Sequence, residues 1–434
     1  MSLIREKSDP ARTADPARTA ASDNRADNRT AARTGPAALL GLLTAAGGPR
    51  YATALVVDAV GGGLLRPFLL LYGIGVLHLR AGAVGLALSA GMVAGLLVVP
   101  LTGRWIDRGA RTLPAAVTLV LRAAGAFTLL AADGLPLFAA AAVLFGTGSQ
   151  SWPTTHTAVV STLTAGRLRD AALAAGRSLR NAGMGAGALL ATVAVASGPQ
   201  VIRALAGVTA VTCLVAAALV ASRRVRAPQR VVEQARAAGP TGEPLRRITL
   251  LSLANLPYAF CFDVLEVALP ALLVLRLHAS PAWSSGVFVG NTVLVIALQL
   301  ALVLRLANRS RRAVLASAGV VLSVSYLGFW AAGSLGGTPG AVGVAAVAVL
   351  YTLGEILYTG SGPALVAASA PPHLLGRAVA RWELSTGVGR AAAPAALTAL
   401  LAVGPGTLWG VLAAATAIGA AAVLRLGPVE QPHG

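Results

Sequence analysis

The chain has 434 residues, of which 56% are hydrophobic and only 12% are charged, and its mean hydropathy is +0.73. This composition is far more apolar than that of a soluble globular protein, so it predicts a polytopic membrane protein. The formal net charge of +19 does not indicate nucleic-acid binding, because the basic residues punctuate the hydrophobic runs instead of clustering on one soluble domain.

Residues 1–48 differ from everything that follows. The sequence DPARTA occurs twice in succession within residues 9–20, and large apolar side chains are scarce. Such a segment cannot bury a core, and it lacks the apolar centre and the cleavage site of a secretory signal. We therefore expect a disordered cytoplasmic tail.

From Tyr51 to Leu426 the chain can hold twelve apolar segments of the roughly 20 residues that span a bilayer as a helix. This predicts an all-α membrane protein with two six-helix bundles. The expected spans lie near 51–77, 83–103, 113–132, 136–160, 175–197, 203–222, 248–276, 283–304, 313–333, 340–362, 378–402 and 406–425. The expected divisions are the tail over 1–48, a first bundle over 49–222, a central cytoplasmic loop over 223–247, a second bundle over 248–426 and a cytoplasmic tail over 427–434.

Arginine placement orients these spans. Alternate loops are rich in arginine, whereas the loops between them carry little beyond Arg80, Arg203 and His278. The basic loops contain Arg104, Arg108 and Arg111; Arg167 and Arg169; Arg223, Arg224, Arg226, Arg230, Arg236, Arg246 and Arg247; Arg305, Arg309, Arg311 and Arg312; and Arg377. The positive-inside rule then predicts a multi-pass protein of the cell membrane with both termini in the cytoplasm.

The two halves share a pattern. GRWIDRGAR at 103–111 aligns without gaps to LRLANRSRR at 304–312, at an offset of 201 residues, and Pro67 matches Pro270 at an offset of 203. Two parallel six-helix repeats explain this similarity. The alternative is two unrelated basic turns in an arginine-rich chain.

The loop after the second span also carries a family signature. It supplies Gly103, Asp107, Arg108 and Arg111 in a pattern similar to G-x-x-x-D-R/K-x-G-R/K-R/K, although Ala110 replaces the second glycine and Thr112 the last basic residue. With the six-plus-six layout, the chain resembles the major facilitator superfamily over roughly residues 50–426. The resemblance implies two pseudo-symmetric bundles and transport by alternating access. A bacterial member is expected, since Lys7 is the only lysine and alanine and glycine are in excess, as in a GC-rich genome. An efflux-like member is expected because no sugar-type signature is recognisable and the charges expected in the cavity are acidic in excess.

The same resemblance implies a conformational gate. Gly103 lets two helices approach closely, and the Asp107 carboxylate could meet the positive N-terminal dipole of the eleventh helix, which would begin within 376–382. The plainer interpretation is that the arginines, among them Arg108 and Arg111, only anchor the loop in the cytoplasm.

Ionisable residues inside spans cost about 2.5 to 3.5 kcal/mol each at the bilayer centre, so each is a candidate functional residue. They are the acids Asp58, Asp263, Glu266 and Glu355 and the bases Arg66, Arg122 and Arg390. Four carboxylates against three guanidiniums leave one negative charge unmatched, which favours a carboxyl that takes up a proton, or a cationic substrate. A static network of ion pairs around Arg66 is the alternative.

The family resemblance places Asp58, Arg66, Asp263, Glu266 and Glu355 on the first, seventh and tenth helices, which line the central cavity. Arg122 and Arg390 rank second because their helices support the cavity or form the interface between the halves. Further candidates for the cavity wall are Gln150, Asn255, Tyr351 and Tyr358, the two tyrosines flanking Glu355 by one turn each. Lone polar residues of this kind more often join helices to each other.

The sequence does not contain the motifs of ATP-driven transporters, metal sites or membrane enzymes. No GxxxxGK[ST] loop is present, so direct ATP drive is not expected. Cys213 and Cys261 lie in apolar runs and the five histidines are scattered, so we expect no disulfide framework, metal, cofactor or enzymatic activity. A polytopic sensor remains an alternative, although no soluble output domain is apparent.

The expected function is proton-coupled efflux of a neutral or cationic drug-like compound or secondary metabolite, by a monomer whose partners are the substrate, protons and lipid. Proton-coupled uptake of a small solute is the alternative. Two features of drug antiporters are missing: Ala142 stands where their fourth-helix arginine is expected, and the glycine-proline pattern of their fifth helix does not occur. Antiport is therefore an inference from the family.

Overall fold

The structure is a computed structural model that describes residues 36–195, 198–237 and 243–426. Within these residues the regular secondary structure is helical, and one isolated β-bridge lies outside the helices. Nine of the described helices are long and apolar enough to cross a membrane, and the pair Leu40–Leu65 and Leu69–Val76, bent by 44°, forms a tenth such segment. Two further long helices, α6 (Leu135–Leu163) and α7 (Gly166–Val195), complete the twelve.

The first half contains six spans. They are α2 (Pro36–Leu65) with its broken continuation η1 (Arg66–Phe68), α3 (Leu69–Leu71) and η2 (Tyr72–Val76), then α4 (Ala81–Asp107), α5 (Thr112–Leu130), α6 (Leu135–Leu163), α7 (Gly166–Val195) and α8 (Pro199–Ala221). A short helix, α9 (Gln229–Ala237), follows in the connection between the halves.

The second half has the same order. Its first span is interrupted and consists of α10 (Glu243–Ala259), α11 (Cys261–Asp263), η3 (Val264–Ala268) and η4 (Ala271–Arg276). The others are α12 (Pro281–Arg305), α13 (Arg311–Ser334), α14 (Gly337–Ser369), α15 (Leu375–Val403), preceded by η5 (Pro372–Leu374), and α16 (Pro405–Arg425).

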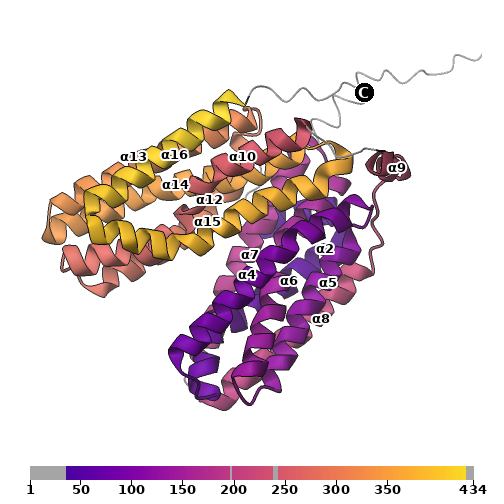
Figure 1. Cartoon of the computed structure of the whole chain (residues 1–434), viewed down its shortest axis with the longest axis horizontal. Helices are drawn as coiled ribbons and strands as arrows, with labels where there is room; N and C mark the ends of the chain where they lie inside the picture. Colours follow the sequence, from indigo (N-terminus) through magenta and orange to yellow (C-terminus); the bar gives the residue numbers. More distant parts are fainter. Residues whose placement is uncertain (1–35, 196–197, 238–242, 427–434) are drawn as a thin grey trace, which may run out of the picture.

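The two halves form separate bundles that meet at one end and diverge at the other. Figure 1 shows the bundles as the two arms of a V, with α9 beside the closed end. Helices α4, α6 and α7 of the first half contact α12, α14 and α15 of the second. The predicted fold class, an all-α membrane protein with two six-helix bundles, is confirmed.

The first and seventh spans break in matching ways. Each ends in a π-helix, Tyr72–Val76 in one half and Ala271–Arg276 in the other, and each π-helix is followed by a histidine at positive φ, His78 at 53° and His278 at 51°. The residue after each histidine donates its backbone N–H to a carbonyl six positions earlier, at 3.0 Å in the first half and 2.9 Å in the second. These breaks lie 200 residues apart, which supports the internal repeat.

The outer surface of the bundles is apolar. Leu86 is 75% exposed, Leu97 72%, Ile418 69% and Val403 76%. Exposed apolar area on this scale is unfavourable in water, but it is the expected surface of helices that face lipid. Aromatic side chains fill the interior of the second bundle, where the tilted rings of Trp409 and Phe329 lie 5.3 Å apart between centroids.

Two expectations about segment boundaries need correction. Residues 36–48 belong to α2, not to a disordered tail, because Leu42 and Leu43 bury their side chains in the first bundle. The helix bends at Gly48, whose φ is 78°, just before Pro49. Residues 1–35 and the tail over 427–434 lie outside the described residues.

The central connection, expected as a loop over 223–247, contains helix α9. Its sequence QRVVEQARA places Val231 on the buried side and the charged Glu233 on the exposed side, as in an amphipathic helix. Helix α9 contacts η5, the short turn that precedes α15. The connection is therefore packed against both halves at the closed end.

Candidate functional site: a charged cavity between the two halves

A cavity of about 510 Å³ lies between the two halves. Its walls come from α2, α4, α6 and α7 of the first half and from α11, α12, α14 and α15 of the second. Apolar side chains form much of the wall, among them Met92, Phe145, Trp152, Phe262 and Trp382. The volume is within the range of pockets that hold drug-sized ligands.

The charges in this cavity differ from those expected. Four arginines line it, Arg66, Arg177, Arg180 and Arg390, together with three carboxylates, Asp58, Glu355 and Glu383. The lining thus has one guanidinium more than carboxylates. The predicted acidic excess, and with it the argument for a cationic substrate, is wrong.

Asp58 has a partner that sequence reasoning ranked second. Arg122 on α5 donates from Nη1 to Asp58 Oδ1 at 2.5 Å, and both side chains are only 5% exposed. Arg66, the expected centre of a salt-bridge network, forms no ion pair among the described residues. Its side chain is exposed on the cavity wall.

Asp263 and Glu266 do not act as neighbours. Asp263 lies beside Arg390, at 3.8 Å from its Nε, and the Arg390 guanidinium also lies over the Phe262 ring at 5.2 Å. Glu266 is exposed and outside the cavity lining. The segment between them is π-helical, so the shared face expected for residues three apart in an α-helix is lost.

Glu355 lies on α14 and faces the cavity. One of its oxygens, Oε2, is buried without a hydrogen-bond partner in the described part of the chain. One turn earlier, Thr352 donates its hydroxyl to Asn291 Oδ1 at 2.6 Å and so ties α14 to α12. Glu355 therefore lies on a helix that this hydrogen bond holds in place, and its Oε2 atom can still accept a hydrogen bond or a proton.

Sequence reasoning missed three charged lining residues: Arg177 and Arg180 on α7, and Glu383 on α15. Each lies within an expected span, so the cost of a charge inside the membrane could have identified them. No ion pair or hydrogen bond joins these side chains to another described residue, although Glu383 interacts electrostatically with both arginines across the cavity.

The four neutral candidates divide into two groups. Gln150 and Tyr358 line the cavity, whereas Asn255 and Tyr351 do not. Asn255 accepts a hydrogen bond from the Tyr358 hydroxyl at 2.8 Å and donates to Ser385 at 2.8 Å, so it joins α10 to α14 and α15. Tyr351 is fully buried and donates its hydroxyl to a backbone carbonyl of α11. Asn255 and Tyr351 thus hold helices together.

The segment 103–111, named the gate loop after the role expected for it, meets α15 where the family resemblance implied. Asp107 Oδ1 accepts the backbone N–H of Gly376 at 2.7 Å, and Oδ2 accepts the Nε of Arg377 at 2.7 Å and its backbone N–H at 3.3 Å. A Cβ atom on Gly103 would lie 2.7 Å from the Gly376 carbonyl oxygen. The two helices can approach this closely only because both positions are glycine.

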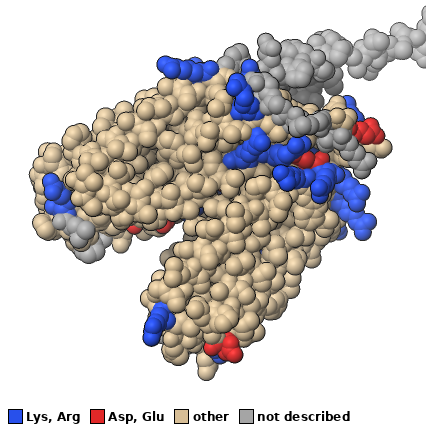
Figure 2. Space-filling model, in the orientation of Figure 1, with Lys and Arg blue, Asp and Glu red and all other residues tan. Residues whose placement is uncertain are grey.

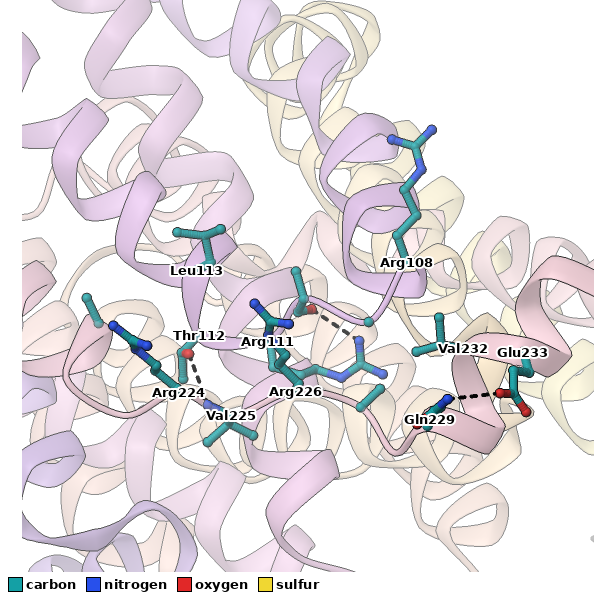
Figure 3. A pocket seen from close by; sticks show the side chains of 14 residues that line it. Arg108, Arg111, Thr112, Leu113, Arg224, Val225, Arg226, Gln229, Val232 and Glu233 are labelled. Atoms are coloured by element: carbon teal, nitrogen blue, oxygen red, sulfur yellow. Dashed lines mark hydrogen bonds between the residues drawn. The ribbon is translucent and has the colours of Figure 1, made fainter.

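The two arginines of the loop differ in environment. Arg111 is buried and donates to Thr162 Oγ1 at 2.8 Å and to the Ile106 carbonyl, so it holds the loop against α6. Burial lowers the pKa of Arg111, while the nearby Asp107 carboxylate raises it. Arg108 is exposed and lines a separate pocket of about 770 Å³ at the closed end (Figure 3).

That pocket lies between the gate loop and the connection. An antiparallel β-bridge pairs Ala110 with Arg226, and the Ala227 N–H donates to the Gly109 carbonyl at 3.0 Å. The Val225 N–H donates to Thr112 Oγ1 at 3.3 Å, as the dashed line in Figure 3 shows. The pocket is walled by the first half and the connection alone, so it does not lie on a path between the halves.

A second contact between the halves at the closed end was not predicted. Arg311, at the start of α13, donates from Nε to Asp170 Oδ2 of α7 at 2.7 Å. Figure 2 shows basic side chains gathered near this end of the molecule, where the bundles meet. At the closed end, two carboxylates of the first half thus each form an ion pair with an arginine of the second half.

Comparison with known proteins gives a family match over part of the chain and a shared fold. The family profile described as Major Facilitator Superfamily matches residues 51–252. A sequence comparison with curated proteins gives no match. Within the described residues, no group of three or more histidine, cysteine or acidic side chains is placed to hold a metal ion.

Several solved structures share the fold at low sequence identity. The human organic anion transporter MFSD10 is 18% identical, with a TM-score of 0.62 over 89% of this chain and 96% of its own. A bacterial homologue of the iron transporter ferroportin, in an outward-facing state, is 16% identical, with a TM-score of 0.67 over 87% and 98%. The transporter FucP in the outward conformation is 13% identical, with a TM-score of 0.71 over 90% and 98%.

Proposed function

We propose that the chain is a member of the major facilitator superfamily and a secondary transporter that moves a small organic compound across the cell membrane, coupled to protons. The observation that carries this proposal is a charged cavity between two bundles whose described residues meet at one end and diverge at the other. A carrier that alternates its access needs such a site and a contact that can open.

The closed end is proposed to face the cytoplasm. The arginines of the gate loop and of the connection lie at this end, which supports that orientation by the positive-inside rule. In this topology the described state is open to the outside. Breaking the contact of Asp107 with α15 would then release the cytoplasmic end and let the bundles rock about the cavity.

Glu355 is the proposed proton carrier. It faces the cavity, and one of its oxygens is buried without a partner. Asp58 is less suited to this role because it is held in a close ion pair with Arg122. Asp263 is the second candidate, since its contact with Arg390 is looser, at 3.8 Å.

Export is the direction proposed from the sequence, and uptake is the second candidate. The basic excess of the cavity removes one argument for export of a cation. The structural neighbours, described as organic anion, iron and sugar transporters, act on chemically different solutes, so they do not select one substrate for this chain.

Reconstitution into proteoliposomes tests the proposal. A panel of labelled anionic, neutral and cationic compounds would be screened by counterflow, and each compound that exchanges would then be measured with a proton gradient of either sign. We expect at least one compound to be exchanged and to be driven by the gradient, and the sign of the effective gradient distinguishes export from uptake. Gradient-independent exchange would exclude proton coupling. If no compound moved, a non-transporting membrane sensor would become the better explanation.

A further inference from the structure

We infer that the substrate is an organic anion, whose negative group binds between Arg66, Arg177 and Arg180 and whose apolar body lies against the aromatic wall of the cavity. The inference rests on the proposed transport function and adds the chemical class of the substrate. It reverses the expectation of a neutral or cationic compound that the sequence suggested.

The positive charges face one side of the cavity. Arg177 and Arg180 lie three residues apart on α7 and therefore share a helix face. Arg66 lies where α2 gives way to η1, and like the other two it lines the cavity. None of the three forms an ion pair with a described residue, and the Nε of Arg180 is buried without a hydrogen-bond partner.

The carboxylates do not balance this group. Asp58 is matched by Arg122, which contacts it at 2.5 Å, and Arg390 is matched by Asp263 at 3.8 Å. Glu355 and Glu383 then remain to face Arg66, Arg177 and Arg180. The cavity lining therefore carries a net positive charge when every group is ionised.

An unmatched positive charge within a protein that spans a membrane is unfavourable, and an anion removes that cost. Guanidinium groups suit this role because their planar donors bind a carboxylate, sulfonate or phosphate with two parallel hydrogen bonds. A cation would instead meet three guanidiniums with only two carboxylates to attract it. The chemistry of the cavity thus favours a negative group on the substrate.

The rest of the cavity selects an apolar body. Trp152 and Trp382 line it from opposite halves, and Leu55, Met92 and Phe145 extend the apolar surface. The volume of about 510 Å³ holds more than an inorganic ion. A compound with one acidic group and one aromatic or aliphatic body fits both parts of the wall.

The test compares three compounds of the same shape but different charge: naphthylacetate, naphthylacetamide and naphthylethylamine. Each is titrated calorimetrically into the purified full-length protein in detergent. We expect the acid to bind at least about tenfold more tightly than the amide, a difference of about 1.4 kcal/mol, and the amine to bind more weakly still. Equal affinity for acid and amide, tighter binding of the amine, or no binding of the acid would overturn the inference.

Arginine variants locate the anion. Arg177→Gln and Arg180→Gln should each weaken binding of the acid by about tenfold or more and leave the amide unaffected, because only the acid makes a charge-assisted hydrogen bond. Arg177→Lys keeps the charge and should retain part of the affinity, which separates loss of charge from loss of folding. Arg425→Gln, at the exposed end of α16 and outside the cavity, is the matched control. Unchanged acid binding in both glutamine variants would refute this site.

Counterflow with the same compounds keeps the two proposals apart. If the amine were exchanged equally well by the unaltered protein and by the arginine variants, the proposal of an anionic substrate would be refuted and the proposal of transport would stand. Binding of the acid, lost in the Arg177→Gln variant, without exchange of any compound would support the anion site and refute transport.

Discussion

Asp107 and Gly376 lie 269 positions apart in the chain, yet the Asp107 carboxylate accepts the Gly376 backbone N–H at 2.7 Å. Gly376 is in the first turn of α15, so the negative charge lies at the positive end of a helix dipole that belongs to the other bundle. The contact can exist only while this end of the molecule is closed. The contact therefore joins the two halves and stabilises the arrangement in which this end is closed.

Replacing Asp107 with alanine should open the closed end. The variant loses two backbone contacts and the ion pair with Arg377 together, and charge-assisted hydrogen bonds each contribute about 1.5 to 3 kcal/mol. We expect the closed-to-open ratio to fall by at least about tenfold. Spin labels on the ends of α4 and α15 would measure it as a longer distance.

Arg108→Ala is the control for this prediction, because Arg108 belongs to the same loop but is exposed, and no hydrogen bond or ion pair joins its side chain to a described residue of the second half. It should leave the distance unchanged. Loss of folding and expression in Asp107→Ala would instead show that the loop is required for the fold and does not control the closed-to-open ratio.

Gly103 tests the same closure by steric means. Its missing Cβ would lie 2.7 Å from the backbone carbonyl oxygen of Gly376, and a backbone atom has little freedom to move aside. Gly103→Ala should therefore separate α4 from α15 at the closed end and reduce transport turnover. Gly85→Ala on the same helix is the control, because nothing lies within 4 Å of its added methyl group. Equal behaviour of the two variants would contradict the close approach.

The ion pair of Asp58 and Arg122 should be structural. Both side chains are nearly inaccessible, so Asp58→Asn leaves an unpaired buried guanidinium, at a cost of about 3 to 5 kcal/mol. We expect a lower melting temperature in detergent. The double variant Asp58→Asn with Arg122→Met should recover most of the loss, because no lone charge remains. If Asp58→Asn melted normally but lost gradient-driven transport, Asp58 would be the proton carrier.

Hydropathy predicted the spans well, because crossing a membrane constrains a segment by length and apolarity alone. The errors have physical causes. Leu42 and Leu43 pack into the first bundle ahead of Gly48 and Pro49, two residues that disfavour a continuous helix and so suggested that the span begins after them. The β-bridge between Ala110 and Arg226 depends on how the connection folds back, which its sequence does not reveal.

The site was harder to predict than the fold. The family pattern located Asp107 and its partner, because that contact depends on chain positions that the family shares. The pairing of Asp58 with Arg122 depends on how α2 and α5 are rotated against each other, and spacing along the chain does not give that rotation. Arg177, Arg180 and Glu383 were overlooked although they carry the same signal as Glu355, a charge inside a span.

Topology can be tested without a substrate. A cysteine at Ala237, the exposed last residue of α9, should react with a membrane-impermeant thiol reagent only after the cytoplasmic side is made accessible. A cysteine at Asp133, in the turn between α5 and α6 at the opposite end, should react in intact cells. The native Cys213 and Cys261 are fully buried and give little background. The reverse pattern would place the gate outside the cell.

Proton coupling should depend on Glu355. If this carboxyl loads and releases a proton in each cycle, Glu355→Gln fixes it in the neutral form, and the gradient can no longer drive transport. Exchange of labelled for unlabelled substrate need not empty the proton site, so counterflow should continue at a rate near that of the unaltered protein. Both rates would be measured in the same proteoliposomes, because a misfolded variant loses both.

Three further variants, Asp58→Asn, Asp263→Asn and Glu266→Gln, complete the test. Glu266 is exposed outside the cavity, so its variant should keep gradient-driven transport and act as the control. Asp263→Asn leaves Arg390 without its carboxylate but still over the Phe262 ring, so we expect a change in substrate affinity and preserved coupling. If all four variants kept normal gradient-driven transport, these carboxyls would not carry the coupled proton. Coupling would then have to use Glu383, the remaining carboxylate of the cavity, or another ion.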